Sequence, residues 1–337
     1  MDEKGLKAII GKFLIDAPVE SVAPLGNGLI NDTYKVTTAG AAPDYVLQRI
    51  NNAIFTDVDL LQHNIEAVTA HIRKKLVAAG ETDIDRKVLT FVPTAEGKTY
   101  YQDAAGKYWR VSVFIPRAKT FEAVNPEYSY HAGKAFGNFE AMLVDLEEPL
   151  GETIPDFHNM ELRIRQLRDA VAADTVGRMS EVADIVSELE AHADEMCKAE
   201  RMGRAGELPK RICHCDTKVN NMMFDEDGRV LCVIDLDTVM PSFVFSDYGD
   251  FLRTGANAVA EDDPHIDKVA FRRDIFEAFT RGYLESARFL TDYINGDTYY
   301  KIGYPEHNLV RTRNQLQLFR TVYDQQAYMQ DFIRNCQ

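Results

Sequence analysis

The chain has 337 residues and a formal net charge of −15; 45% of its residues are hydrophobic and 27% are charged. This length predicts two domains or lobes with a core each. The acidic balance excludes broad binding to nucleic acid, because phosphate backbones require a basic face. No apolar run approaches the roughly 20 residues that span a bilayer, and the acidic opening Met-Asp-Glu-Lys-Gly lacks a signal-peptide core. The five cysteines have no framework spacing, so we expect reduced thiols in a cytoplasmic protein.

The first third of the chain is predicted to combine two helices with a small antiparallel sheet. Apolar side chains at helical spacing indicate a helix over residues 4–15 and a longer one over Val58–Ala79. Short β-branched runs bounded by turn residues predict strands at Val19–Pro24, Asp44–Ile50, Val88–Pro93, Tyr100–Gln102 and Tyr108–Ile115.

Two glycines, Gly26 and Gly28, precede a β-rich run that ends near Val36. Glycine lets a backbone approach phosphate closely, so this segment is a candidate glycine loop. The same pattern fits an ordinary hairpin turn, and both interpretations stay open at this point.

After Val124 the character changes from β to α. Asn125 followed by Pro126 is typical of an N-cap and a first-turn proline, and opens a predicted helix. Further helices are predicted over Glu161–Asp174, Ser180–Met202, Phe271–Leu290 and Asn308–Ile333. We therefore predict an α+β fold with a first lobe over residues 1–116 and a second over 117–337.

A hairpin within Ile212–Asp237 gathers the polar residues with the clearest chemical pattern. Met222–Phe224 and Val230–Ile234 are short apolar runs, and the Asp-Gly signal at Gly228 predicts the turn between them. The hairpin brings the loop His214–Asn221 beside the residues that follow the second strand, Asp235 and Asp237.

The spacing within this cluster is typical of phosphoryl transfer of the kinase type. Asp216 can orient an acceptor hydroxyl and take its proton. Asn221 and Asp235 supply the oxygen ligands that Mg²⁺ prefers. Lys218 can offset charge on the transferred phosphoryl group, and His214 can brace the loop through hydrogen bonds.

Two other chemistries were weighed for the same residues. Cys213, His214, Cys215 and Cys232 are ligand types for zinc, but adjacent residues on a strand alternate in direction and the C-x2-C loop is absent. Buried, reduced cysteine is the commoner state. A Ser/His/Asp hydrolase would need a G-x-S-x-G turn, which the chain lacks.

Several segments resemble the aminoglycoside phosphotransferase and choline kinase-like superfamily, and within it the bacterial N-acetylhexosamine 1-kinases. The segments are HCDTKVNN, VIDLDTVMP, SDYGDFLRTGAN, LGNGLINDTY, LQRIN, NIEAVT, YWRVSVFI and HNLVRTRNQ, which together span about residues 20 to 320. The resemblance implies a bilobal protein-kinase-like fold, with a small antiparallel-sheet lobe and a larger, mainly helical lobe.

The resemblance also implies the ligands and the residues that meet them. ATP would be the co-substrate, Mg²⁺ the cofactor and a small sugar the acceptor, phosphorylated at its anomeric hydroxyl. Asp247 matches an aspartate that braces the catalytic loop. The implied nucleotide-binding residues are Gly26, Gly28, Asn31, Arg49 and Glu66, and the implied acceptor-binding residues are Asp216, Thr254 and Arg311.

One of these assignments involves a choice between neighbours. Gln48 and Arg49 point to opposite faces of a strand, so only one of them can reach the nucleotide phosphates. We favour Arg49 because it carries the charge, with Glu66 of the following helix as its partner.

Two positions depart from the sugar-kinase motif and keep the acceptor open. The related enzymes have His where Leu29 stands and an aromatic residue where Thr254 stands. A kinase for an amino alcohol, an aminoglycoside or another sugar is the alternative, since an acidic protein favours cationic acceptors. A nucleotide-binding pseudokinase is disfavoured because Asp216, Asn221 and Asp235 are all present. The sequence indicates no oligomeric state.

Overall fold

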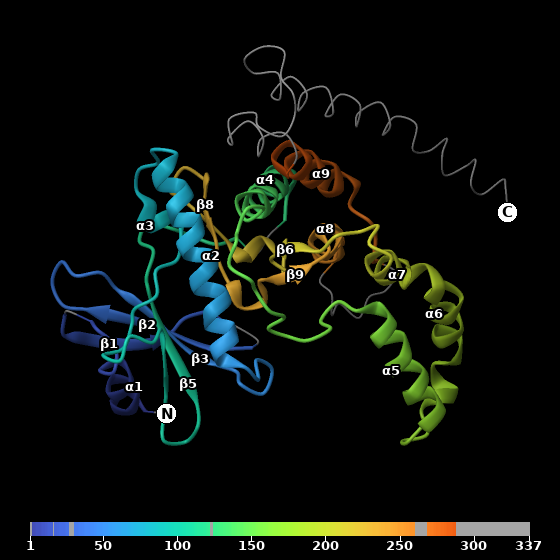
Figure 1. Ribbon diagram of the computed structural model, residues 1–337, viewed down its shortest axis with the longest axis horizontal. Coiled ribbons are helices and arrows are strands. Elements are labelled where there is room, and N and C mark those ends of the chain that lie inside the picture. The colour runs from blue at the N-terminus through green and yellow to red at the C-terminus, as the bar shows by residue number, and fades with distance from the viewer. Residues whose placement is uncertain (1, 16, 27–29, 122–123, 260–267, 288–337) are drawn as a thin grey trace, which may run out of the picture.

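The computed structural model describes residues 2–15, 17–26, 30–121, 124–259 and 268–287 (Figure 1). Its first part is built on a five-stranded antiparallel sheet with the strand order β1-β2-β3-β5-β4. One face of this sheet packs on helix α1 (Glu3–Ile10) through a buried apolar cluster. The strands are β1 (Val19–Pro24), β2 (Asp32–Thr38), β3 (Tyr45–Ile50), β4 (Tyr100–Gln102) and β5 (Tyr108–Val113).

Helix α2 (Val58–Ala78) lies between the sheet and the second part of the chain (Figure 1). Asp57 caps it by accepting a hydrogen bond from the Leu60 N–H at 2.9 Å. Its apolar stripe belongs to a buried cluster that also includes Phe139, Leu143 and Val239 from beyond residue 116. The two parts therefore share a hydrophobic core, and their contact is part of what stabilises the fold.

The second part is mainly helical, with short strands at its centre. Asn125 caps α4 by accepting a hydrogen bond from the Tyr128 N–H at 2.8 Å, as the Asn-Pro signal predicted. The helices are α3 (Ile84–Lys87, at the edge of the first part), α4 (Pro126–Met142), α5 (Met160–Ala173), α6 (Ala183–Met196), α7 (Lys198–Arg204), α8 (Val244–Gly255) and α9 (Arg273–Ala287). The strands are β6 (Arg211–Cys213), which pairs with β9 (Met240–Ser242), and β7 (Met222–Phe224), which pairs with β8 (Val230–Val233).

The α+β organisation and the central hairpin are confirmed, while three predicted elements differ. Val88–Pro93 is wrong as a strand: Val92 donates to the Val111 carbonyl at 2.8 Å, but only an isolated bridge forms, and Pro93 has no N–H with which to continue a ladder. The helix predicted over 4–15 ends at Ile10. The helix predicted over Ser180–Met202 breaks at Cys197, which is buried against Ile164 of α5.

The predicted helix Asn308–Ile333 lies outside the described residues. Among the helices that the structure describes, none has both the length and the apolar character needed to cross a bilayer.

Helices α4 and α9 approach each other at two glycines. A Cβ at Gly133 would overlap the backbone of Phe279 and Tyr283, and a Cβ at Gly282 would overlap the backbone of Tyr130 and Lys134. We predict that Gly133→Ala lowers the free energy of unfolding by about 1–3 kcal/mol or more, because the helices must separate. Gly249→Ala in α8 is the control, since its Cβ meets nothing within 4 Å. Urea titration measures both, and equal stability of the two variants would contradict the packing described.

Candidate active site

The hairpin of β7 and β8 places Asn221 and Asp235 at the same end of the two strands. Met222 pairs with Val233, and the Ile234 N–H donates to the Asn221 carbonyl at 2.8 Å. In the turn, the Asp225 carboxylate accepts the N–H groups of Asp227 at 2.9 Å and Arg229 at 2.8 Å. The turn is therefore closed by its own side chain, and it fixes the register that brings the predicted metal ligands together.

The loop between β6 and β7, residues 214–221, is anchored by the fully buried side chain of Asp247 in the first turn of α8. Its carboxylate accepts the backbone N–H of His214 at 2.6 Å and that of Cys215 at 2.7 Å. The Thr217 hydroxyl donates to the Asp247 carbonyl at 2.6 Å. These bonds hold Cys215 at a φ of +64°, a conformation that non-glycine residues seldom adopt. The predicted bracing position of Asp247 is confirmed.

The imidazole of His214 is buried and connects the loop to the end of β8. Its Nε2 lies 2.9 Å from the Ile234 carbonyl, which can only accept a hydrogen bond, so Nε2 carries the proton. Its Nδ1 accepts the Asp216 N–H at 3.3 Å. Both ring nitrogens are thus used within the protein. His214 holds Asp216 in place and has no free nitrogen with which to contact a substrate.

Asp216 is partly exposed and is held by two side chains of its own loop. Its Oδ1 lies 2.7 Å from the Lys218 ammonium, and its Oδ2 accepts a hydrogen bond from Asn221 Nδ2 at 3.1 Å. Asn221 Nδ2 also donates to the Asp216 carbonyl at 2.8 Å, which leaves the amide oxygen of Asn221 for another partner. The structure therefore brings Asp216, Lys218 and Asn221 together as one group.

The donor set of Asn221 and Asp235 fits a magnesium ion. Asp235 has a left-handed backbone with a φ of +60°. The residue as a whole is exposed, but the protein around its carboxyl group partly excludes water. This loss of hydration, together with the nearby charges of Asp237 and Asp216, raises the pKa of Asp235 above its usual range. Three carboxylates close together favour a cation, and Mg²⁺ prefers carboxylate and amide oxygens.

A second polar network joins this site to the sheet of the first part. Arg110 of β5 is only 3% exposed in its side chain, and its Nη1 lies 2.6 Å from Oδ1 of the equally buried Asp237. Asn31 donates to the other Asp237 oxygen at 2.7 Å and accepts the Asn51 N–H at 2.9 Å. Arg110 also donates to Gln48 at 3.0 Å. Asp237, two positions after the predicted metal ligand, is thus fixed by Arg110 of β5 and by Asn31, which directly precedes β2.

The structure does not bring Arg49 and Glu66 together. Arg49 is ion-paired with Asp32 across the β2–β3 ladder and is partly exposed. Gln48, on the opposite face of the strand, is the one that points toward the inner network, through Arg110 and Thr33. Glu66 is exposed and accepts a hydrogen bond from the Thr99 hydroxyl at 2.5 Å. The preference for Arg49 over Gln48 therefore finds no support in the geometry.

The remaining predicted residues make local contacts or lie outside the described residues. Gly26 has a φ of +71°, which suits a glycine turn. The Thr254 hydroxyl donates to carbonyls of its own helix, Asp250 and Phe251, each at 3.3 Å. Gly28, Leu29 and Arg311 are not among the described residues.

Sequence reasoning missed Arg110 and the role of Asp237. A signal was present, because YWRVSVFI carries one charged residue in a mainly apolar strand, and such a charge is seldom buried without a partner. Which partner it meets depends on a contact between residues 127 positions apart in the chain.

With this geometry in place, the family follows from comparison. Residues 21–290 match the model of the phosphotransferase enzyme family. The chain belongs to this family. The match begins within β1 and extends past the end of α9, so it covers most of the sheet and the whole Asp216 site. The predicted kinase-like fold is confirmed, and the cluster of Asp216, Asn221 and Asp235 belongs to a kinase-like phosphotransferase.

Solved structures with low sequence identity also align over most of the chain. A spectinomycin phosphotransferase in complex with ADP and spectinomycin is 13% identical, with 93% of each chain covered and a TM-score of 0.49. An ethanolamine kinase from Plasmodium vivax is 14% identical over 93% of this chain and 86% of its own, with a TM-score of 0.46. A choline kinase from Streptococcus pneumoniae is 15% identical over 93% of this chain and 97% of its own, with a TM-score of 0.43.

The two sheet arginines provide a matched test of the inner network. We predict that Arg110→Met lowers the free energy of unfolding by about 3–5 kcal/mol, because Asp237 is left buried without its cation. Arg49→Met removes a partly exposed pair and should change it by about 0–1 kcal/mol. Urea titration of both variants is the measurement. Similar losses in the two variants would show that the Arg110–Asp237 pair is not the buried contact described.

Proposed function

We propose that this phosphotransferase transfers the γ-phosphoryl group of ATP to a hydroxyl of a small molecule, most specifically the anomeric hydroxyl of an N-acetylhexosamine. The observation that supports the reaction type is the Asp216 carboxylate, held at the protein surface between the Lys218 ammonium and the Asn221 amide. A carboxylate oriented in this way can position an acceptor hydroxyl and accept its proton.

Each of these residues has a separate role in the proposed in-line transfer. Asp216 orients the acceptor and takes its proton, while Lys218 is close enough to share its charge with an incoming phosphoryl group. Asn221 and Asp235 would hold Mg²⁺, which when bound offsets the negative charge of the nucleotide phosphates. His214 and Asp247 keep the loop in position, so most of the rate enhancement comes from pre-set geometry and electrostatics.

The proposed nucleotide site involves the chain between β1 and β2. Gly26, which follows β1, has a φ of +71°, and such a backbone suits a glycine loop over phosphates. Asn31 is hydrogen-bonded to Asp237 and so links that loop to the metal-binding segment. We propose that a bound nucleotide lies between this loop and Asp235, in contact with elements of both parts of the chain.

The N-acetylhexosamine assignment rests on the sequence motifs, such as HCDTKVNN and SDYGDFLRTGAN. The net charge of −15 is the observation that favours a second candidate, a cationic acceptor such as an amino alcohol or an aminoglycoside. Both candidates use the same Asp216 chemistry and differ only in what the acceptor pocket recognises.

Asp216→Asn tests the proposed base. The substitution keeps the shape and the bond to Asn221 but removes the proton acceptor, so kcat should fall by about 100-fold or more while the thermal unfolding midpoint changes little. Asp227→Asn, in the exposed hairpin turn, removes a carboxylate from the same hairpin without touching the site and should leave kcat unchanged. Near-normal turnover by Asp216→Asn on the preferred acceptor would rule out this role.

An acceptor screen tests the substrate class. ADP release should be measured with ATP and Mg²⁺ over N-acetylglucosamine, N-acetylgalactosamine, glucose, galactose, choline and kanamycin, each corrected for ATP hydrolysis without acceptor. We expect the two N-acetylhexosamines to give the highest kcat/KM, and a product that loses its reducing end. A preference for choline or kanamycin would replace the sugar by a cationic acceptor. ATP binding without turnover on any acceptor would contradict the enzymatic proposal.

A further inference from the structure

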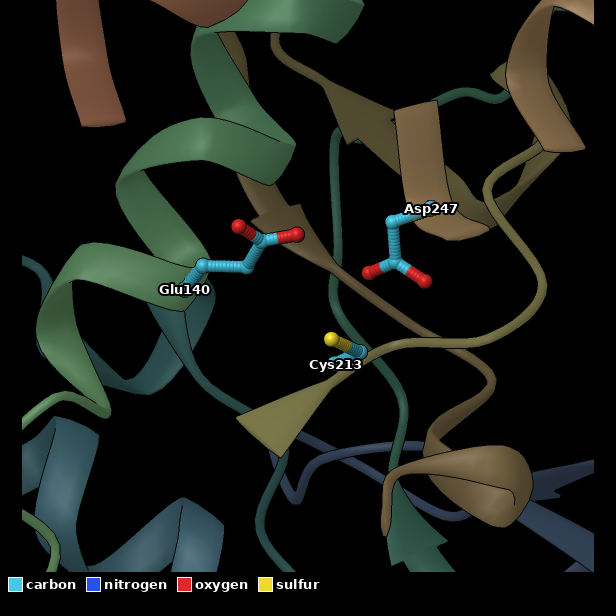
Figure 2. A group of neighbouring side chains, drawn as sticks. All are labelled: Glu140, Cys213 and Asp247. Carbon is cyan, nitrogen blue, oxygen red and sulfur yellow. The ribbon is translucent and has the colours of Figure 1, made fainter. Parts of the chain in front are cut away.

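Two buried acidic side chains meet behind the catalytic loop. Glu140 of α4 is 8% exposed and Asp247 of α8 is fully buried. Figure 2 shows the two carboxyl groups facing each other beside the thiol of Cys213 from β6. An oxygen of each carboxyl group and the Cys213 sulfur all lie within 4.8 Å of one another. None of the sequence motifs or family residues considered above assigns a role to Glu140.

Two carboxylates that share a buried site cannot both be ionised, because their repulsion adds to the loss of hydration. One of them must carry a proton. Asp247 accepts two backbone N–H groups, one on each oxygen, and such bonds favour the charged form. The Glu140 carboxyl group is bound instead by a side chain: its oxygens lie 2.7 and 2.8 Å from the hydroxyl of Tyr283 on α9. The proton therefore belongs on Glu140.

The groups around the pair agree with this distribution. Among the described residues, the titratable side chains near the pair include Tyr283 from α9, Cys213 from β6, His214 and Cys215 from the catalytic loop, and His158, which precedes α5. Burial, and then the charge of Asp247, raises the pKa of Glu140 to about 9. Burial also raises the pKa values of the Cys213 and Cys215 thiols, which stay neutral.

We propose that Glu140 is a positioning residue for phosphoryl transfer: as a neutral acid it donates a hydrogen bond to Asp247, and so holds the carboxylate that anchors the loop of His214 and Asp216. The chain of contact runs from Glu140 to Asp247, from Asp247 to the N–H groups of His214 and Cys215, and from His214 Nδ1 to the Asp216 N–H. Glu140 touches no reacting atom.

A metal ion is the competing occupant of the same site. Zinc would need the Cys213 thiolate and free carboxylate oxygens. Burial raises the pKa of the Cys213 thiol, which makes the thiolate costly to form, and both oxygens of Asp247 already accept N–H groups. A shared proton satisfies the pair without breaking those bonds, so it is the better fit.

The proposal has a defined pH dependence. In the unfolded chain Glu140 releases its proton near 4.5, whereas in the folded protein it keeps the proton to about pH 9. Between these values the folded state binds one more proton than the unfolded state, so this contribution to stability is present at low pH and is lost as the pH rises. Ionisation of Glu140 would also repel the Asp247 carboxylate and so displace the loop that Asp247 anchors.

Glu140→Gln tests the proposal, since glutamine is neutral at every pH and can still donate to Asp247. Urea unfolding of the full chain should be measured at pH 5, 6, 7 and 8. We expect the unfolding constant of the wild type to rise by about tenfold per pH unit relative to that of Glu140→Gln. Glu147→Gln, an exposed position just beyond α4, is the control and should follow the wild type.

Three further measurements separate positioning from a general structural role. At pH 7, Glu140→Gln should keep kcat and KM, whereas Glu140→Leu, which cannot donate to Asp247, should lower kcat more than it changes KM. Above about pH 9 the wild type should lose kcat while Glu140→Gln does not. At pH 7, Asp247→Asn should lower kcat more than Glu140→Gln does, because the NH₂ group of the asparagine would face a backbone N–H.

The outcomes are decisive in both directions. The proposal is overturned if Glu140→Gln and the wild type have parallel pH dependences of unfolding, or if Glu140→Gln loses kcat as severely as Glu140→Leu. Zinc that copurifies with the wild type and is absent from Glu140→Gln would replace the proton by a metal. The kinetic arm rests on the proposed kinase function, but the unfolding arm needs no substrate, so failure of one is distinguishable from failure of the other.

Discussion

The carboxylate of Asp247 is the constraint on which the rest of the site depends. It binds the N–H groups of His214 and Cys215, and it holds Cys215 in a left-handed conformation that an unsupported loop would leave. The direction of the next residue, Asp216, follows from that conformation. A buried charge of this kind is costly, and the site offsets the cost through hydrogen bonds and, in our proposal, through the proton of Glu140.

The same site is also a junction between the two parts of the chain. Arg110 comes from the sheet and Asp237 from the segment after the hairpin, and their buried contact places the segment of Asp235, the proposed metal ligand, against β5. Asn64 of α2 adds a second link, by donating to the Gly151 and Val239 carbonyls at 2.8 and 2.9 Å. Movement of the sheet relative to the helical part would thus move Asp235, so the proposed metal site depends on the arrangement of both parts.

The comparison of sequence with structure shows where local patterns are informative. Asp-Gly turn chemistry and two apolar runs predicted the β7–β8 hairpin, because both signals lie within 13 residues that pair with each other. The choice between Gln48 and Arg49 is a case in which the local pattern is not enough. Alternation shows that the two side chains lie on opposite faces, but which face meets α2 and which meets α1 depends on how the whole sheet packs.

The sequence by itself determined the reaction class and the local elements that carry it: the Asp216-x4-Asn221 spacing, the hairpin that returns to Asp235, and the cap of α4. These depend on neighbours in the chain. Only the tertiary structure decided that Arg110 neutralises Asp237 and that Glu140 faces Asp247, contacts that join residues 127 and 107 positions apart. A buried charge selects its partner by proximity in space, and no spacing along the chain encodes that proximity.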